Sequence, residues 1–310
     1  MTMLSRLFLG LIFLVLSQGL SLQGLAKPLP PENCTDRPFD EGRLWKVSRE
    51  GVPPSYIFGT MHSRDPRILY LPGAVMQVFI ASSTAIFETS LKDDELARNQ
   101  QQLLLKPGES LKELIGTSRF NRLAGLVAPY GVAPATLDRL KVWAAATIIS
   151  QPVPNAGESG RSPLTLLDKE LEKSARIAGK RVIALESNKE QLDIFDSMPA
   201  SVQLEYLDQA MTEHSEIDEE LEKMTSYYLA GNTGWIACDL EETLTGMSAA
   251  LNKIMTTDLI YIRNRHMVER MLPELAQGNV FVGIGALHLP GEEGVLSLLT
   301  QKGYAIERKY

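Results

Sequence analysis

Short apolar runs alternate with longer amphipathic stretches along most of the chain. Compact runs rich in β-branched and aromatic residues are typical of strands. The predicted strands fall at 44–47, 56–58, 84–87, 181–184, 280–284 and 305–307. The first two flank a turn-forming segment at 49–54, and this arrangement predicts a hairpin.

Longer stretches with apolar positions three and four residues apart predict helices. Pro163 and Pro199 lie at or near predicted first turns, whereas Gly179 and Gly231 follow predicted last turns. Because strands are few and helices are long, we expect an α/β protein with a large helical insertion between the sheet-forming ends. The predicted helices fall at 72–82, 93–104, 118–128, 134–150, 163–178, 188–196, 199–230, 238–252, 256–277 and 291–302.

Residues 1–26 have the pattern of a secretory signal peptide. Arg6 precedes a short apolar run, and the segment ends in small residues up to Ala26. A membrane anchor is the alternative, but a bilayer span needs about 20 apolar residues. We therefore predict cleavage after Ala26 and a secreted, periplasmic mature chain without a membrane span. That chain would consist of a Pro-rich extended arm at 27–42 and one domain at 43–310.

Cys34 and Cys238 are the two cysteines of the chain. In an exported protein, two such thiols favour a disulfide over a catalytic pair. The bridge would close a very long loop and tie the N-terminal arm to a late helix. A nucleophilic cysteine is the alternative, although neither cysteine has a histidine or a glycine-rich turn beside it in sequence.

Hydrophobic residues make up 44% of the chain and charged residues 22%, which are ordinary values for a globular protein. Collagen-like, wholly disordered and multi-span membrane proteins are thereby excluded. The net charge is −7 and basic residues do not cluster, so we expect no nucleic-acid partner. The acidic stretch at 213–222 is interpreted as a solvent-facing side of a helix, with a cation site as the alternative.

Two of the four histidines share a local pattern at opposite ends of the chain. Each follows an apolar strand in a Gly-x-x-His motif: Gly59 precedes His62, and Gly285 precedes His288. Ligands in open α/β sheets gather beyond the carboxyl ends of strands, where a glycine allows a sharp turn or a close backbone approach. We therefore expect the two histidines to converge in one crevice. The alternative for each is a buried or capping histidine.

Two glutamates follow apolar runs in the same way. Glu88 follows the predicted strand at 84–87, and Glu186 follows the run at 182–185. A carboxylate at the end of a buried strand needs a partner, a metal or a mechanistic role, and the alternative is a strand-end residue facing water. Arg263, within a predicted helix, is a candidate to stabilise an oxyanion or orient a carboxylate, with surface charge as its alternative.

Taken together, these motifs resemble the TraB/GumN family, which is related to the TIKI metalloproteases and to the wider erythromycin esterase/ChaN-like hydrolases. The resemblance covers residues 43–310. One Gly-x-x-His motif is a weak signal, but two at the expected ends, with both glutamates and the Arg-Asn-x-x-Met motif, are specific. The segments that carry it are Phe58–His62, Glu88, Gly179–Val182, Leu185–Glu186, Gln191, Arg263–Met267, Gly285–Gly291 and Gly294–Tyr304.

The resemblance implies a mixed sheet with flanking helices and a hydrolase-like site at the strand ends, which is metal-dependent in the TIKI branch. In the family, the two motif histidines and the strand-end glutamate are the expected site, and here they match His62, His288 and Glu88. Arg263 and Asn264 match the polar helix motif of the family.

Our first hypothesis is a metal-dependent hydrolase of peptide or other acyl bonds. His62, His288 and Glu88 would hold Mn²⁺, Co²⁺ or Zn²⁺ with an open position for water. Glu186 would be a further ligand or a general base. The expected substrate is a peptide or another small acyl compound, and the oligomeric state is left open.

In that hypothesis, Arg263 and Asn264 would stabilise the oxyanion. Two alternatives stay open. One is a metal-independent esterase in which the first motif histidine acts as a base, oriented by the strand-end glutamate, and the second acts as an acid. The other is a non-enzymatic periplasmic protein that binds or sequesters peptides.

Overall fold

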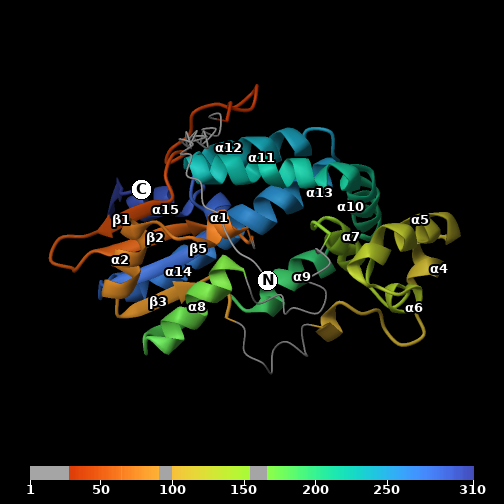
Figure 1. Ribbon diagram of the computed structural model, residues 1–310, viewed down its shortest axis with the longest axis horizontal. Coiled ribbons are helices and arrows are strands. Elements are labelled where there is room, and N and C mark those ends of the chain that lie inside the picture. Colours follow the sequence, from red (N-terminus) through yellow and green to blue (C-terminus); the bar gives the residue numbers. More distant parts are fainter. Residues whose placement is uncertain (1–27, 64, 91–99, 154–165) are drawn as a thin grey trace, which may run out of the picture.

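The computed structural model describes residues 28–63, 65–90, 100–153 and 166–310 (Figure 1). Its centre is a six-stranded sheet with the spatial order β4-β3-β5-β2-β1-β6. β4, β3, β5 and β2 run parallel, whereas β1 is antiparallel to both β2 and β6. All six predicted strands are present, and the α/β class with a mixed sheet is confirmed. The strands are β1 Leu44–Ser48, β2 Ser55–Thr60, β3 Thr84–Phe87, β4 Arg181–Ala184, β5 Val280–Gly285 and β6 Ala305–Arg308.

The carboxyl ends of the four parallel strands lie nearly level at one edge of the sheet. Thr60 and Gly285, the last residues of β2 and β5, are partners in the ladder between these strands. Phe87, the last residue of β3, is paired with Ala184 of β4 and Gly283 of β5. The residues that follow these strands are therefore delivered to one edge, where open α/β sheets bind their ligands.

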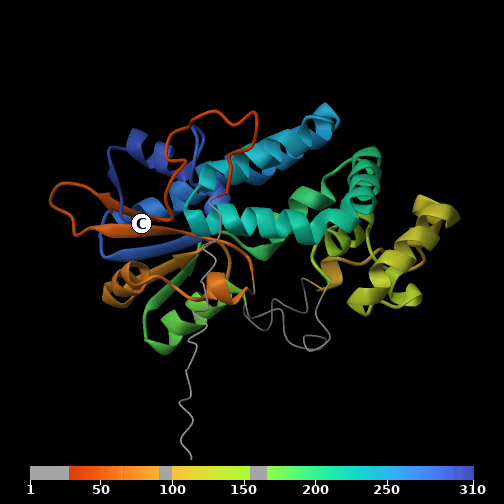
Figure 2. The same ribbon diagram turned by 45° about the horizontal axis from the view of Figure 1, so that its top comes forward.

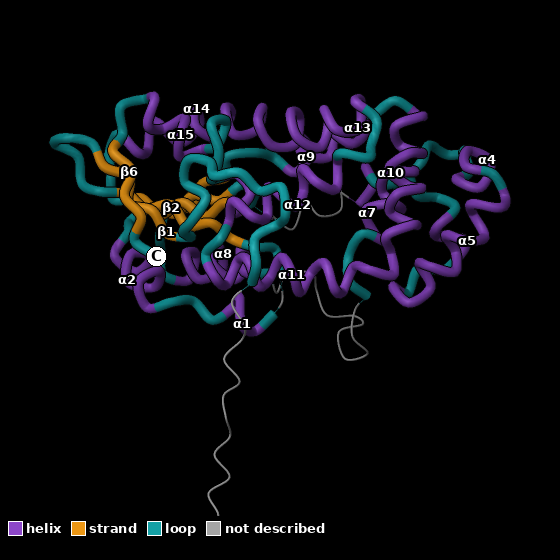
Figure 3. Tube along the Cα trace, turned by 90° about the horizontal axis from the view of Figure 1, so that it is seen from above, coloured by secondary structure: helices purple, strands orange, loops and turns teal. Residues whose placement is uncertain are grey.

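Helices cover both faces of the sheet, so that the strands form the middle of three layers (Figure 3). α14 and α15 pack on one face, and α2, α8 and α11 pack on the other. Every residue of the central strand β5 is buried, as expected for a strand covered on both sides. The helices around the sheet are α1 Pro66–Leu69, α2 Gly73–Ala81, α8 Leu167–Ile177, α11 Ile217–Ala230, α12 Thr233–Leu244, α14 Arg263–Leu275 and α15 Val295–Gln301.

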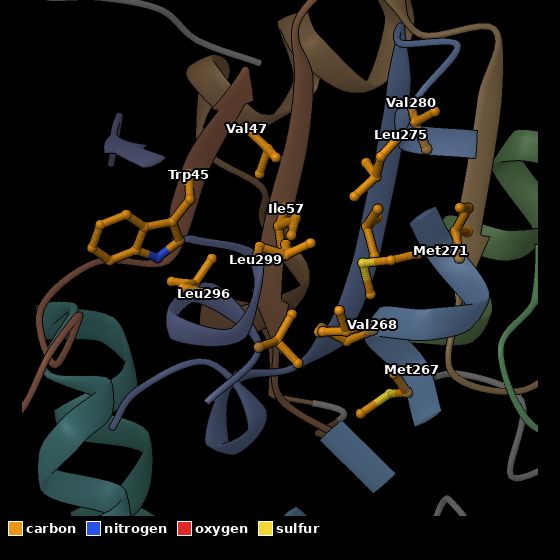
Figure 4. Packing of buried hydrophobic residues seen from close by; sticks show 14 of the residues in the cluster. Trp45, Val47, Ile57, Met267, Val268, Met271, Leu275, Val280, Leu296 and Leu299 are labelled. Carbon is orange, nitrogen blue, oxygen red and sulfur yellow. The ribbon is translucent and has the colours of Figure 1, made fainter. Parts of the chain in front are cut away.

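One core cluster fills the layer between the sheet and the two helices α14 and α15 (Figure 4). Met267, Met271 and Leu275 recur every four residues along α14, so one stripe of this amphipathic helix faces the strands. Ile57 of β2 and Val280 of β5 belong to the same cluster. This packing holds α14 against the strands.

A second hydrophobic core lies among the helices at the opposite end of the molecule from β6 (Figures 1 and 2). Its residues come from the chain between β3 and α8, together with α10. This is the large helical insertion that the sequence predicts. The helices that form it or join it to the sheet are α4 Leu111–Ile115, α5 Thr117–Val127, α6 Pro134–Leu137, α7 Val142–Ile149, α9 Asn188–Asp196, α10 Ala200–Glu213 and α13 Ala249–Lys253.

The predicted helix at 134–150 is in fact two helices, α6 and α7. Between them, Leu140 forms an isolated antiparallel bridge with Leu104. Asp138, which follows α6, accepts a hydrogen bond from the backbone N–H of Lys112 in α4. These contacts between distant segments interrupt the helix, and the local apolar pattern does not reveal them.

The predicted helix at 199–230 is divided into α10 and α11 by a 3₁₀ turn, His214–Glu216. At this turn the His214 ring nitrogen Nδ1 lies 2.9 Å from the carbonyl oxygen of Ile149 in α7. The acidic residues around the turn are mostly exposed, in agreement with a solvent-facing side of the helix.

Two further predicted helices differ from the observed elements. The stretch at 238–252 breaks where the Ser248 side chain caps α13. The stretch at 256–277 begins as a π-helical segment, Ile254–Ile262, and continues as α14. The predicted helix at 93–104 lies largely outside the described residues.

Cys34 and Cys238 form the predicted disulfide, with their Cα atoms 5.3 Å apart. The bridge ties the extended chain before β1 to α12. The carbonyl oxygen of Pro38 also accepts a hydrogen bond from the N–H of Gly291, so the arm reaches the segment that follows β5.

The predicted signal peptide at 1–26, including the cleavage position after Ala26, lies outside the described residues. Among the helices that the structure does describe, none is long and apolar enough to cross a membrane.

Candidate functional site

The four parallel strands each deliver one polar side chain to the same edge of the sheet. His62 follows β2, Glu88 follows β3, Glu186 follows β4, and His288 ends the 3₁₀ turn that follows β5. Glu88, Glu186 and His288 are buried, whereas the side chain of His62 is 57% exposed. The structure therefore places the two motif histidines at one edge of the sheet, together with the two strand-end glutamates.

Gly285 is the point on which three of these side chains converge. Its N–H donates a hydrogen bond of 2.5 Å to Glu88 Oε1. A Cβ atom at this position would lie 3.0 Å from Glu88 Oε1, 3.4 Å from His288 Cδ2 and 4.0 Å from His62 Nε2. The glycine of the second Gly-x-x-His motif thus leaves room for the side chains that surround it.

Arg263, the first residue of α14, joins the two glutamates. Its Nη2 lies 2.8 Å from Glu88 Oε2 and 2.8 Å from Glu186 Oε2, and its Nε donates to Glu186 Oε2 at 2.9 Å. The guanidinium is largely buried, with 11% of the side chain exposed, so the surface-charge alternative is wrong for this residue. Although burial opposes its charge, the two carboxylates raise the pKa of Arg263 above its ordinary value.

Glu88 is ionised in this surrounding. Burial opposes its ionisation, but His288 and Arg263 together lower the pKa of Glu88 to about 2. Glu186 is held by the same guanidinium and by Gln191, whose Nε2 donates to Glu186 Oε2 at 3.2 Å. The edge therefore combines two buried carboxylates with one buried cation, which leaves one net negative charge before the histidines are counted.

His288 has one ring nitrogen committed and one free. Its Nδ1 lies 2.6 Å from Asn264 Oδ1, and the Asn264 amide nitrogen donates to the carbonyl of Glu293 at 2.7 Å. Since the amide nitrogen is engaged elsewhere, Asn264 presents its oxygen, and Nδ1 of His288 carries the proton. Its Nε2, 3.8 Å from Glu88 Oε1, is then unprotonated and has a free lone pair. Burial lowers the pKa of His288 to about 4.

His62 has a corresponding arrangement that sequence reasoning missed. Its Nδ1 lies 3.4 Å from Oδ2 of Asp168, a buried residue in the first turn of α8. The other carboxylate oxygen of Asp168 accepts a 2.5 Å hydrogen bond from Thr60 at the end of β2. The available signal was that Asp168 lies at helical spacing with Leu171 and Ala175, on the face of α8 that the apolar pattern predicts to be buried.

The side chains around Gly285 match the ligands of a divalent ion in kind. Histidines that bind metals usually have their second ring nitrogen held by a carboxylate or carbonyl oxygen, and both His62 and His288 have such a partner. Glu88 supplies a carboxylate oxygen between them. Within the described residues, however, no three His, Cys, Asp or Glu side chains are already grouped as a metal site.

Comparison with known proteins gives relatives that are named metalloproteases. The chain is 25% identical to metalloprotease TIKI2 of Danio rerio over 316 residues, which cover 85% of this chain and 60% of that protein. It is 25% identical to the metalloprotease TIKI homolog of Amphimedon queenslandica over 334 residues, with 89% and 63% covered. It is 23% identical to metalloprotease TIKI1 of Homo sapiens over 313 residues, with 85% and 61% covered.

The chain thus spans about three fifths of the length of these relatives. No solved structure matches it. The model of the TraB/PrgY/gumN family matches residues 43–308, a range that includes every strand and every side chain of the site described above. The chain therefore belongs to the TraB/PrgY/gumN family.

Proposed function

We propose that this protein is a secreted hydrolase that cleaves peptide or other acyl bonds with a divalent metal ion. The observation that carries the proposal is the convergence of His62, His288 and Glu88 around Gly285, with Nδ1 of His288 bonded to Asn264 and Nδ1 of His62 facing the buried Oδ2 of Asp168, 3.4 Å away. The metalloprotease names of the relatives support the same chemistry. The disulfide between Cys34 and Cys238 is compatible with secretion, and the periplasm is the compartment we propose.

In this proposal, His62, His288 and Glu88 would hold the ion. A divalent ion such as Mn²⁺, Co²⁺ or Zn²⁺ supplies a water of lowered pKa and polarises the scissile carbonyl. Asn264 holds His288 in the tautomer that presents Nε2 to the site, and Asp168 would do the same for His62 once its free Oδ2 accepts from Nδ1.

The remaining polar residues set the charge and orientation of this centre. Arg263 keeps Glu88 ionised and fixes its direction through the contact with Oε2. Glu186, on the other side of the guanidinium, is the carboxylate we propose as general base. Both amide atoms of Asn264 are already engaged, so we assign it to the orientation of His288. The nitrogens of Arg263 are also engaged, with Glu88, Glu186 and the carbonyl of Leu259, so we assign Arg263 to the two carboxylates instead of an oxyanion.

The test uses the purified mature chain, with metal content measured by elemental analysis and hydrolysis measured on a peptide mixture by mass spectrometry. We expect bound metal, loss of cleavage after chelation, and recovery when one of the three ions is added back. His62→Ala and His288→Ala should each remove cleavage. A chain that binds no ion and cleaves equally well after His62→Ala would overturn the proposal.

A metal-independent hydrolase is the second candidate, and one observation favours it. The pair of Asp168 and the half-exposed His62 has the form of a carboxylate-oriented general base. Cleavage that survives strong chelators but is lost in His62→Ala would select this candidate over the first.

A further inference from the structure

A large cleft lies where the chain passes from the site into the helical insertion. Its volume is about 840 Å³, and one of its walls is the start of α9, from Ser187 to Lys189. Ser187 follows Glu186 directly in the chain, so the cleft begins one residue from a carboxylate of the site. The opposite wall is formed by residues from 101–107, which precede α4, and by Arg139 and Lys141 between α6 and α7; Figure 1 shows α9 between the sheet and these helices.

The lining of this cleft is cationic, although the chain as a whole has a charge of −7. Lys106, Arg139, Lys141 and Lys189 line it, and no Asp or Glu belongs to the lining within the described residues. Two of these cations are paired with carboxylates outside the cleft. Lys141 lies 2.7 Å from an oxygen of Asp196, and Lys189 lies 2.6 Å from an oxygen of Asp193.

The other two cations, Lys106 and Arg139, have no carboxylate within ion-pair distance among the residues that the structure describes. Glu109 accepts a hydrogen bond from the backbone N–H of Lys106, and Asp138 accepts one from the backbone N–H of Lys112. These two neighbouring carboxylates are therefore already engaged with backbone groups. The charge of Asp138 still attracts Arg139, but no ion pair forms among the described residues, so both cations stay available to a ligand carboxylate.

The same cleft also offers apolar surface and a free amide. Leu104 and Leu105 are half-buried in its lining. Asn188 Nδ2 is buried without an acceptor among the described residues. The N–H of Leu105 donates to the carbonyl of Arg139 at 2.8 Å, and this backbone bond joins the segments that carry the two unpaired cations.

From these contacts we propose that the cleft binds a carboxylate of the substrate, next to an apolar side chain, and so selects acidic peptides for the neighbouring site. The inference rests on the proposed hydrolase function. Lys106 and Arg139 bind the carboxylate, and Leu104 and Leu105 contact the apolar side chain. The carboxylate belongs either to a glutamate or aspartate side chain or to the C-terminus of the peptide.

The test measures peptide binding by fluorescence anisotropy in a His62→Ala background, so that turnover does not consume the probe. One set of labelled, C-terminally amidated peptides of Ala and Leu carries Glu or Gln at each position in turn. A second set contains neither Glu nor Gln, and its peptides end in either a free carboxylate or an amide. The charge variant is Lys106→Gln with Arg139→Gln, and the matched control is Arg49→Gln with Lys302→Gln, two exposed cations outside the cleft.

We expect a preference of about fivefold to tenfold at low salt for one carboxylate set over its neutral partner, because two exposed cations acting on one carboxylate contribute energy of that order. The two sets show whether the side chain or the C-terminus supplies the carboxylate. The preference should disappear in the charge variant and persist in the control. Equal binding of charged and neutral peptides, or a preference that survives in the charge variant, would overturn the inference.

Hydrolysis by the unsubstituted chain is measured on the same peptides, which separates this inference from the proposed function. A carboxylate preference in binding without cleavage of any peptide overturns the hydrolase and keeps the cleft as a binding site. Cleavage that does not distinguish the charged peptides from their neutral partners overturns the cleft alone.

Discussion

Asp168 is a buried carboxylate placed to orient His62, one of the proposed site residues. One oxygen is occupied by the hydroxyl of Thr60, so the other is available to Nδ1 of His62, 3.4 Å away. A fixed tautomer is needed whether Nε2 of His62 binds a metal or accepts a proton, because both roles use its lone pair.

We therefore expect Asp168→Asn to lower kcat/KM for peptide hydrolysis about 10- to 100-fold, as is common when the partner of a metal-binding histidine is removed. The substitution keeps the shape of the side chain, so Tm should change little. The control is Glu172→Gln, one turn further along α8, where the carboxylate bonds to Ser90 and Arg176 instead. Equal losses of activity in the two variants would argue against an orienting role for Asp168.

Gly285 permits a second prediction at the same scale. A methyl group there would lie 3.0 Å from Glu88 Oε1, closer than real Cβ atoms normally approach, and 3.4 Å from the ring of His288. Gly285→Ala should therefore displace these side chains and remove most peptide cleavage, measured beside circular dichroism to confirm the fold.

Gly125 is the matched control for that substitution. It lies within α5, and a methyl group there would meet no atom within 4 Å. Gly125→Ala should keep full activity and stabilise the chain by about 0.5–1 kcal/mol, because alanine favours the helix. Full activity of Gly285→Ala would show that the three side chains need not converge at this point.

At the scale of elements, the strands were predictable because their signals are local. Each of the six apolar runs became a strand, and the residues that follow the parallel strands were predictable as site candidates because such strands share an edge. The helix breaks were not predictable, since they depend on contacts between distant segments such as Leu104 and Leu140. The same holds for Asp168, whose partner lies on another element, 106 positions away in sequence.

Arg263 was predictable only in part. The sequence singled it out as a candidate to orient a carboxylate, but its double contact with Glu88 and Glu186 depends on how α14 packs across the sheet. Periodicity along α14 predicts that its apolar stripe is buried and says nothing about which strand ends its first turn approaches.

The link between the arm and α12 gives a prediction at this scale. Replacing both Cys34 and Cys238 by serine should lower the free energy of unfolding by about 2–5 kcal/mol, because the bridge closes a very long loop. Chemical denaturation measures this change. Peptide cleavage well below Tm should stay within about threefold, since no contact around Gly285 involves either cysteine. A loss of activity without a loss of stability would show that the bridge serves the site itself.

At the scale of the whole molecule, the buried charges make stability depend on pH. His288 titrates near its ordinary pKa of 6.5 in the unfolded chain but at about 4 in the folded chain. The unfolded chain therefore binds this proton first as the pH falls, and unfolding becomes easier between these values. At still lower pH, protonation of Glu88 lowers the free energy of unfolding further, because its folded pKa of about 2 is below its ordinary value of 4.5.

We expect chelator-treated protein to lose about 3 kcal/mol of unfolding free energy between pH 7 and pH 4 through His288. Urea denaturation at a series of pH values measures this slope. His288→Asn should flatten it over that interval. A slope that is the same in the variant would show that other groups carry the acid sensitivity.

The position of β5 in the sheet has a consequence for folding during synthesis. It lies between β2 and β3, yet it is made after both of them and after the whole helical insertion. Until β5 is inserted, β2 and β3 each keep an unpaired edge of the kind that templates aggregation. A chain interrupted before residue 280 would therefore lack His288 and leave two strand edges open to pairing with other chains.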